Sequence, residues 1–132
     1  MAAKTAEDPV IFIVDDDDDV RCGVTRLIRS FGLPVRPYAD AGGFLDALTG
    51  EEKGCVLLDV TMPRLKGTQV LELLSERRNP LPVIVVSARD DDATRDLARS
   101  LGAKMFLRKP FDDQALVDAI NWATGNLFGA LR

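Results

Sequence analysis

Residues 10–19, VIFIVDDDDD, decide the fold class, because five consecutive apolar residues run directly into five aspartates. An unbroken apolar run of this length is typical of a strand buried on both faces, as in a parallel sheet covered by helices. The same change from apolar to polar recurs at CVLLD (55–59), VIVVS (83–87) and MFLRK (105–109). Between these runs, apolar residues recur every three or four positions, as they do in helices. The alternation predicts an α/β domain with a parallel sheet.

The chain divides into five strand–helix units. Strands are predicted at 10–14, 34–38, 55–58, 82–86 and 105–107, and helices at about 20–31, 41–48, 70–74, 93–101 and 116–123. Pro34 and Pro37 place the second strand at the edge of the sheet, because proline cannot donate a hydrogen bond to a central ladder.

Aspartates stand where helices are expected to begin. We expect Asp18 or Asp19 to cap the first helix, and Asp112 or Asp113 to cap the last, by accepting hydrogen bonds from free N–H groups.

Length and composition indicate one globular domain. The chain has 132 residues, of which 46% are hydrophobic and 29% are charged, and these values are typical of proteins with a single core. We expect a single domain over 1–132 with loose ends at 1–8 and 125–132. No apolar run approaches the roughly 20 residues that cross a bilayer, and the N-terminal MAAKTAEDP lacks the apolar centre of a secretory signal. Neither a membrane span nor export is expected.

Charge and missing residue types exclude several kinds of site. A net charge of −4 and a pI near 4.8 disfavour direct nucleic-acid contact, which needs clustered Lys and Arg. The absence of histidine excludes a Ser-His-Asp triad and the usual zinc sites, so any metal must be held by oxygens. Cys22 and Cys55 have no closely spaced partner and are predicted to be inert core thiols, as in a protein of the reducing cytoplasm.

Polar residues follow the buried-type strands at the point where each strand stops. They are Asp15, Asp16, Asp59, Ser87 and Lys109. In an open parallel α/β sheet the carboxyl ends of the strands form the ligand-binding crevice, so these side chains should converge. Several adjacent carboxylates repel one another unless a cation is present, and oxygen ligands favour a hard ion such as Mg²⁺. The sequence therefore predicts a magnesium-dependent phosphoryl-transfer site.

Each of these residues has a predicted role. Asp59 stands alone at the end of a central strand and is the candidate nucleophile, since a carboxylate can form an acyl phosphate. Asp15 and Asp16 are expected to bind Mg²⁺, with Mn²⁺ as an alternative ion. Lys109 would stabilise charge on the phosphoryl oxygens, and Ser87 would hydrogen-bond one of them.

The motifs IVDDDDDVR, LLDVTMPRLKG, VIVVSAR and FLRKPF occur in this order over residues 10–123. The chain resembles the receiver domains of bacterial two-component response regulators, most closely those of nitrogen-fixation regulators. This resemblance implies a flavodoxin-like (βα)5 fold: a doubly wound, five-stranded parallel sheet of order 2-1-3-4-5 with helices on both faces.

The resemblance also implies how the metal and the phosphoryl group are held. It assigns Asp15 and Asp16 to the acidic pair, with Asp16 as the direct metal ligand, and Asp59 to the phosphoacceptor. The backbone carbonyl of Thr61 would complete the protein's metal ligands. Thr61 and Arg89 occupy the two variable positions that tune dephosphorylation in this family.

Further residues match the family's switching machinery. Ser87 matches the switch hydroxyl, and Lys109 the family's lysine, with Lys109–Pro110 expected to be a cis peptide. Phe106 matches the aromatic switch position on the last strand. The implied output surface comprises the fourth helix, the fifth strand and the fifth helix.

The expected function is that of a signalling receiver. A histidine kinase or a phosphotransfer protein would phosphorylate Asp59, and the altered surface would bind a downstream target, a fused effector or a second copy of the domain. Such a domain promotes only its own phosphotransfer and dephosphorylation, so it is not expected to be an enzyme. The chain could be a stand-alone regulator or a module of a longer transcriptional regulator. A receiver-like interaction domain that works without phosphorylation is the alternative, whereas Thr61 disfavours a phosphatase that needs a second acid at that position.

Overall fold

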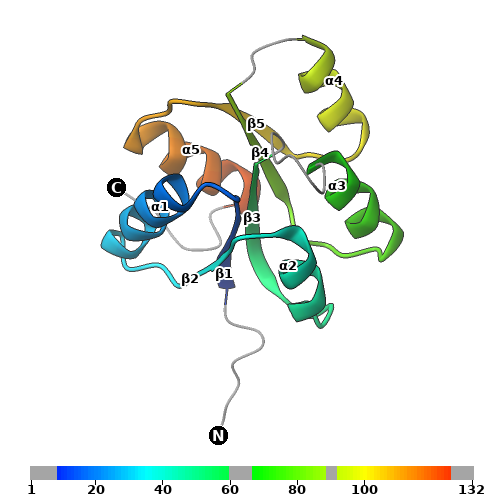
Figure 1. Ribbon diagram of the computed structural model, residues 1–132, viewed down its shortest axis with the longest axis horizontal. Helices are drawn as coiled ribbons and strands as arrows, with labels where there is room; N and C mark the ends of the chain where they lie inside the picture. Colours follow the sequence, from blue (N-terminus) through cyan, green and yellow to red (C-terminus); the bar gives the residue numbers. More distant parts are fainter. Residues whose placement is uncertain (1–8, 60–66, 89–91, 126–132) are drawn as a thin grey trace, which may run out of the picture.

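The computed structural model describes residues 9–59, 67–88 and 92–125. Its strands are β1 (Pro9–Val14), β2 (Val35–Tyr38), β3 (Lys53–Asp59), β4 (Val83–Ser87) and β5 (Met105–Arg108), and its helices are α1 (Asp18–Ser30), α2 (Ala41–Ala47), α3 (Gly67–Glu76), α4 (Asp92–Ser100) and α5 (Asp113–Thr124). The strands are parallel and form one sheet of order β2-β1-β3-β4-β5 (Figure 1). The predicted fold class and strand order are confirmed.

Alternating residues of the central strands build two separate cores. Phe12 of β1 faces the core that contains Phe44 of α2 and Leu74 of α3. Its neighbour Ile13 faces the opposite core, with Ile120 of α5. Since successive side chains of a strand point to opposite faces, α1 and α5 cover one face of the sheet while α2, α3 and α4 cover the other (Figure 1). This two-sided burial explains why β1, β3 and β4 read as unbroken apolar runs.

The third strand begins two residues earlier than the prediction. Lys53 and Gly54 interrupt the apolar pattern, yet they pair with Pro9 and Val10 of β1. Gly54 has a φ of +123°, and a Cβ at this position would lie 1.8 Å from the carbonyl oxygen of Val10. Close approach of two backbones therefore selects glycine here, and an apolar pattern does not detect that requirement.

The cap of α1 differs from the prediction. Asp17, and not Asp18 or Asp19, is the N-cap, and its Oδ1 accepts a hydrogen bond of 3.1 Å from Val20 N. A run of identical residues contains no signal for which member caps the helix. At α5 the prediction is confirmed, because Asp112 accepts from Ala115 N at 2.8 Å.

Exposure corrects the prediction for one of the two cysteines. Cys55 is fully buried in β3, but Cys22 is exposed on α1, so the prediction that it is a core thiol is wrong. Cys22 lies outside the apolar stripe that α1 turns toward the sheet.

Trp122 of α5 is 67% exposed and contributes little to the core. In the part of the chain that the structure describes, no helix has the length and hydropathy needed to cross a membrane.

Candidate functional site

The β1–β3 register brings the predicted carboxylates together. Val14 pairs with Leu58, so Asp15 and Asp59, which follow them, lie side by side at the carboxyl end of the sheet. One carboxylate oxygen from each of Asp15, Asp16 and Asp59 lies within 4.8 Å of the others. Asp15 and Asp59 are only 5% and 4% exposed, whereas Asp16 is exposed. The site thus has two buried acids and one that is open to solvent.

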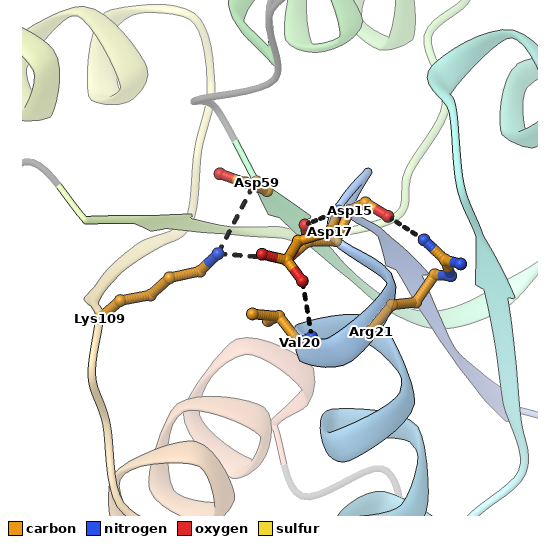
Figure 2. A network of polar contacts seen from close by, with 6 residues as sticks. All are labelled: Asp15, Asp17, Val20, Arg21, Asp59 and Lys109. Atoms are coloured by element: carbon orange, nitrogen blue, oxygen red, sulfur yellow. Dashed lines mark hydrogen bonds and ion pairs between the residues drawn. The ribbon is translucent and has the colours of Figure 1, made fainter.

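Lys109 reaches the two buried carboxylates from the loop after β5. Its Nζ lies 3.2 Å from Oδ2 of Asp15 and 3.5 Å from Oδ2 of Asp59 (Figure 2). The backbone N–H of Lys109 donates to the carbonyl oxygen of Ser87 at 2.8 Å, which ties this loop to the end of β4. The Lys109–Pro110 peptide is cis, as the resemblance implies.

The electrostatics of Asp15 reflect a crowded acidic site. Burial is the largest influence on the pKa of Asp15 and raises it above its ordinary value, and the neighbouring Asp59 charge raises it further. The hydrogen bond from Asp17 N and the ammonium group of Lys109 act in the opposite direction without cancelling the rise. One lysine therefore does not fully compensate the clustered carboxylates, and a divalent cation would stabilise their ionised forms.

The loop that carries the acidic residues is held in place by its own hydrogen bonds. Oδ1 of Asp15 accepts from Asp17 N at 3.0 Å, and the backbone carbonyl of Asp15 accepts from a guanidinium nitrogen of Arg21 at 2.8 Å (Figure 2). Arg21 also pairs with Asp18 one turn earlier. Arg21 was not among the predicted site residues, although its spacing of three residues from Asp18 on a helix is the kind of signal that could have found it.

Ser87 and Phe106 occupy the neighbouring strands. Ser87 is completely buried at the end of β4, one residue beyond the partner of Asp59 in the β3–β4 ladder. Phe106 of β5 is half-buried against the α2–α3–α4 core, and the guanidinium carbon of Arg95 lies 5.1 Å from its ring centroid. Thr61 and Arg89 lie outside the described residues, so their predicted roles stay predictions.

This donor set suits a hard cation and phosphoryl transfer. Carboxylate oxygens are ligands that Mg²⁺ prefers, and it commonly takes one or two of them together with water and phosphate oxygens. Asp15, Asp16 and Asp59 could hold such an ion. Beside it, the Lys109 ammonium would meet charge on a phosphoryl group attached to Asp59.

A family model described as the response regulator receiver domain matches residues 11–121. The chain belongs to this family. The receiver domain is 43% identical over 123 residues to the transcriptional regulatory protein TdiR of Thauera aromatica, covering 93% of this chain and 54% of that protein. It is 38% identical to the transcriptional regulatory protein FixJ of Azorhizobium caulinodans, covering 87% of this chain and 54% of the relative. The resemblance to nitrogen-fixation regulators is thereby confirmed.

Solved structures agree with this assignment. The structure titled FixJ-N has a TM-score of 0.84 and 29% identity, with coverage of 91% of this chain and 96% of that chain. The response regulator StyR has a TM-score of 0.82 and 38% identity, with coverage of 89% and 59%. Phosphorylation-dependent switching is the expected function of such a receiver domain, and receiver domains bind Mg²⁺ at an acidic pocket. The chain spans about half the length of the curated relatives it matches.

Proposed function

We propose that this receiver domain accepts a phosphoryl group on Asp59 from a histidine kinase or a phosphotransfer protein, with Mg²⁺ held by Asp15, Asp16 and Asp59. The observation that carries the proposal is the position of Lys109 Nζ, within 3.5 Å of Asp59 and 3.2 Å of Asp15. A cation placed between two buried carboxylates can stay in contact when one of them becomes an acyl phosphate. The backbone carbonyl of Thr61 is the further metal ligand in this proposal.

In the proposed reaction a carboxylate oxygen of Asp59 attacks phosphorus. The new P–O bond forms as the P–N bond to the donor's histidine breaks, and the electron pair of that bond returns to the imidazole. Lys109 stabilises the phosphoryl oxygens, and Ser87 donates a hydrogen bond to one of them. When bound, Mg²⁺ neutralises phosphoryl charge, and Mn²⁺ is an alternative ion with the same oxygen preference.

The phosphoryl group is the signal, and its hydrolysis ends the signal. We assign to the domain only its own phosphotransfer and dephosphorylation, with no separate substrate. In this proposal Thr61 and Arg89 tune the lifetime of the aspartyl phosphate.

The proposed output surface is formed by α4, β5 and α5. A cavity of about 470 Å³ there is lined by residues that include Arg95, Phe106 and Trp122. Phosphorylation would replace the singly charged Asp59 carboxylate with an acyl phosphate that carries about −1.5 to −2 charges next to Ser87, and movement of Ser87 and Phe106 would transmit this change to the exposed Trp122. The output would be binding to a downstream protein, to a fused effector or to a second receiver. TdiR and FixJ are named as transcriptional regulators, so a fused effector fits the family.

The proposed setting is the cytoplasm, and the partners are proteins rather than DNA or membranes. Both cysteines are free, as is usual in a reducing compartment. The net charge of −4 disfavours contact with a phosphate backbone.

Intact mass tests the phosphoacceptor directly. The wild type and Asp59→Asn are incubated with acetyl phosphate, with and without Mg²⁺. Asp46→Asn, which changes an exposed aspartate of α2, is the matched control. One phosphoryl mass is expected on the wild type and the control only when Mg²⁺ is present, and none on Asp59→Asn. A phosphoryl adduct on Asp59→Asn would show that another residue is the acceptor. The alternative would be favoured if no form gained a phosphoryl mass although Mg²⁺ binds, and if beryllofluoride had no effect either. The domain would then be an interaction domain that works without phosphorylation.

A further inference from the structure

A second cavity lies on the α1 side of the domain, beside the edge strand β2. Its volume is about 350 Å³, and it is lined by Arg21, Cys22, Thr25, Arg26, Arg29 and Pro37. None of these residues belongs to the acidic cluster of Asp15, Asp16 and Asp59. The cavity therefore needs an explanation separate from phosphoryl transfer.

Positive charge is concentrated at this cavity in a chain that is acidic as a whole. Arg21 is paired with Asp18 and bonded to the Asp15 carbonyl. Within the described part of the chain, Arg26 and Arg29 have no carboxylate partner. Both are exposed and stand three residues apart on α1, where like charges repel. Two uncompensated guanidinium groups thus point to an anionic ligand.

A buried hydroxyl group supplies an independent observation. Thr25 is 7% exposed, and its Oγ1 has no hydrogen-bond partner among the described residues. A threonine within a helix usually donates to the carbonyl one turn earlier, and a buried hydroxyl without any partner is unfavourable. The hydroxyl oxygen is shielded in the structure, but Thr25 also lines the cavity, so rotation of its side chain would let the hydroxyl donate to a ligand atom there.

We propose that this cavity binds the phosphate group of a small phosphomonoester. Guanidinium groups match phosphate in charge and in their forked geometry, and the charge of about −1.5 to −2 on a phosphomonoester is balanced by Arg26 and Arg29. The Thr25 hydroxyl donates to a phosphate oxygen. Pro37 and the Cys22 side chain supply an apolar surface for the organic part, and a volume of about 350 Å³ is in the range of small-ligand pockets.

Binding is measured by NMR titration with inorganic phosphate, with phenyl phosphate and with a phosphopeptide, in EDTA so that no metal recruits phosphate to the acidic site. Arg26→Gln/Arg29→Gln removes the two unpaired charges. Arg36→Gln/Arg99→Gln is the matched control, because it removes two exposed arginines outside the cavity. The amides of α1 are expected to shift with saturation in the wild type and the control. Affinity should fall at least tenfold in the first double variant, and about 2- to 10-fold in Thr25→Val, which keeps the side-chain shape but removes the donor.

Three results would overturn the proposal. They are equal affinities in the two double variants, shifts reproduced by chloride at the same ionic strength, and binding only of a phosphopeptide, which would make the cavity a protein-docking surface. Circular dichroism of each variant identifies any that fails to fold, and Thr25→Val, which keeps every charge, then provides a separate test.

Cys22 offers a second readout at the same cavity. Anionic iodoacetate and neutral iodoacetamide both alkylate an exposed thiol, but only the first is attracted by the arginines. The rate ratio of iodoacetate to iodoacetamide should fall in Arg26→Gln/Arg29→Gln and stay unchanged in the control, and phenyl phosphate should slow both reactions in the wild type. An unchanged ratio in the first double variant, or no protection by phenyl phosphate, would contradict a phosphate site.

Discussion

Gly54 gives the sharpest test of how the acidic site is assembled. It pairs with Val10 near the start of the β1–β3 ladder, whose other end positions Asp15 beside Asp59. A Cβ at Gly54 would lie 1.8 Å from the carbonyl oxygen of Val10, and 2.7 Å from the carbonyl carbon and the nitrogen of that residue. The obstacle is backbone, so a rotamer change cannot relieve it. Gly54→Ala must therefore push β1 and β3 apart.

Two costs add up in Gly54→Ala. A residue other than glycine at a φ of +123° pays about 1–3 kcal/mol of backbone strain. Forcing an extra carbon into a packed region costs about 1–3 kcal/mol more. The sum, about 2–6 kcal/mol, is a large part of the roughly 5–15 kcal/mol that stabilises an ordinary domain.

Urea unfolding of Gly54→Ala and Gly102→Ala separates the two costs. Gly102 has a similar φ of +103°, but a Cβ there meets nothing within 4 Å. Gly102→Ala should therefore lose only the strain energy, about 1–3 kcal/mol of stability, and Gly54→Ala should be the less stable of the two by about 1–3 kcal/mol. Equal free energies of unfolding would refute the proposed contact between β1 and β3. Where Gly54→Ala is still folded, its Mg²⁺ affinity should also fall.

Lys109→Gln should slow phosphorylation by acetyl phosphate about 100-fold, because it removes the cation beside Asp59; mass spectrometry follows the rate. With iodoacetamide at pH 8, Cys22 should be alkylated rapidly, while Cys55 should stay unmodified in the native protein, since burial raises the pKa of the Cys55 thiol to about 12. Burial acts to raise the pKa of Glu52, but hydrogen bonds from Thr49 and Gly50 outweigh it and the pKa is lowered. The Glu52 carboxylate therefore stabilises the fold above its unfolded-state pKa, and this contribution is lost as the pH falls through the folded-state value. Glu52→Gln should reduce the free energy of unfolding by about 1 kcal/mol at pH 7 and by less at low pH in urea titrations.

Each of these expectations has a result that contradicts it. Lys104→Gln changes an exposed lysine and controls for loss of charge, so an equal slowing in both lysine variants would remove Lys109 from the site. Modification of Cys55 at the rate of Cys22 would contradict the burial of β3. A Glu52→Gln effect that does not change with pH would show that the carboxylate charge is irrelevant to stability.

The strand ends were predictable because a strand that is buried on both faces has a distinctive run of apolar residues. In a sheet covered on both faces, every residue of a central strand must be apolar, so the first polar residue marks the carboxyl end. This logic located Asp59 and Ser87 from the sequence alone. The N-terminal part of β3 was missed, since Lys53 is exposed and Gly54 is chosen by backbone contact rather than by hydropathy.

Helical exposure was harder to predict than strand burial. Cys22 occurs among the apolar residues of α1, but it faces solvent. A helix buries only one stripe, so a shift of one position moves a residue from the core to the surface. The cavity beside β2 was not predicted for the same reason, because it depends on which face of α1 carries Arg26 and Arg29.

The five consecutive aspartates show where sequence reasoning stops. They are chemically identical, yet in the structure Asp15 is buried against Lys109, Asp16 is open to solvent, Asp17 caps α1 and Asp18 pairs with Arg21. What distinguishes them is their distance from the end of β1, because pairing of Val14 with Leu58 fixes which carboxylate lies beside Asp59. A one-residue slip of that register would place Asp16 beside Asp59 and leave Val14 without its buried position. The apolar run before the aspartates therefore determines their chemistry, which is why the two must be interpreted together.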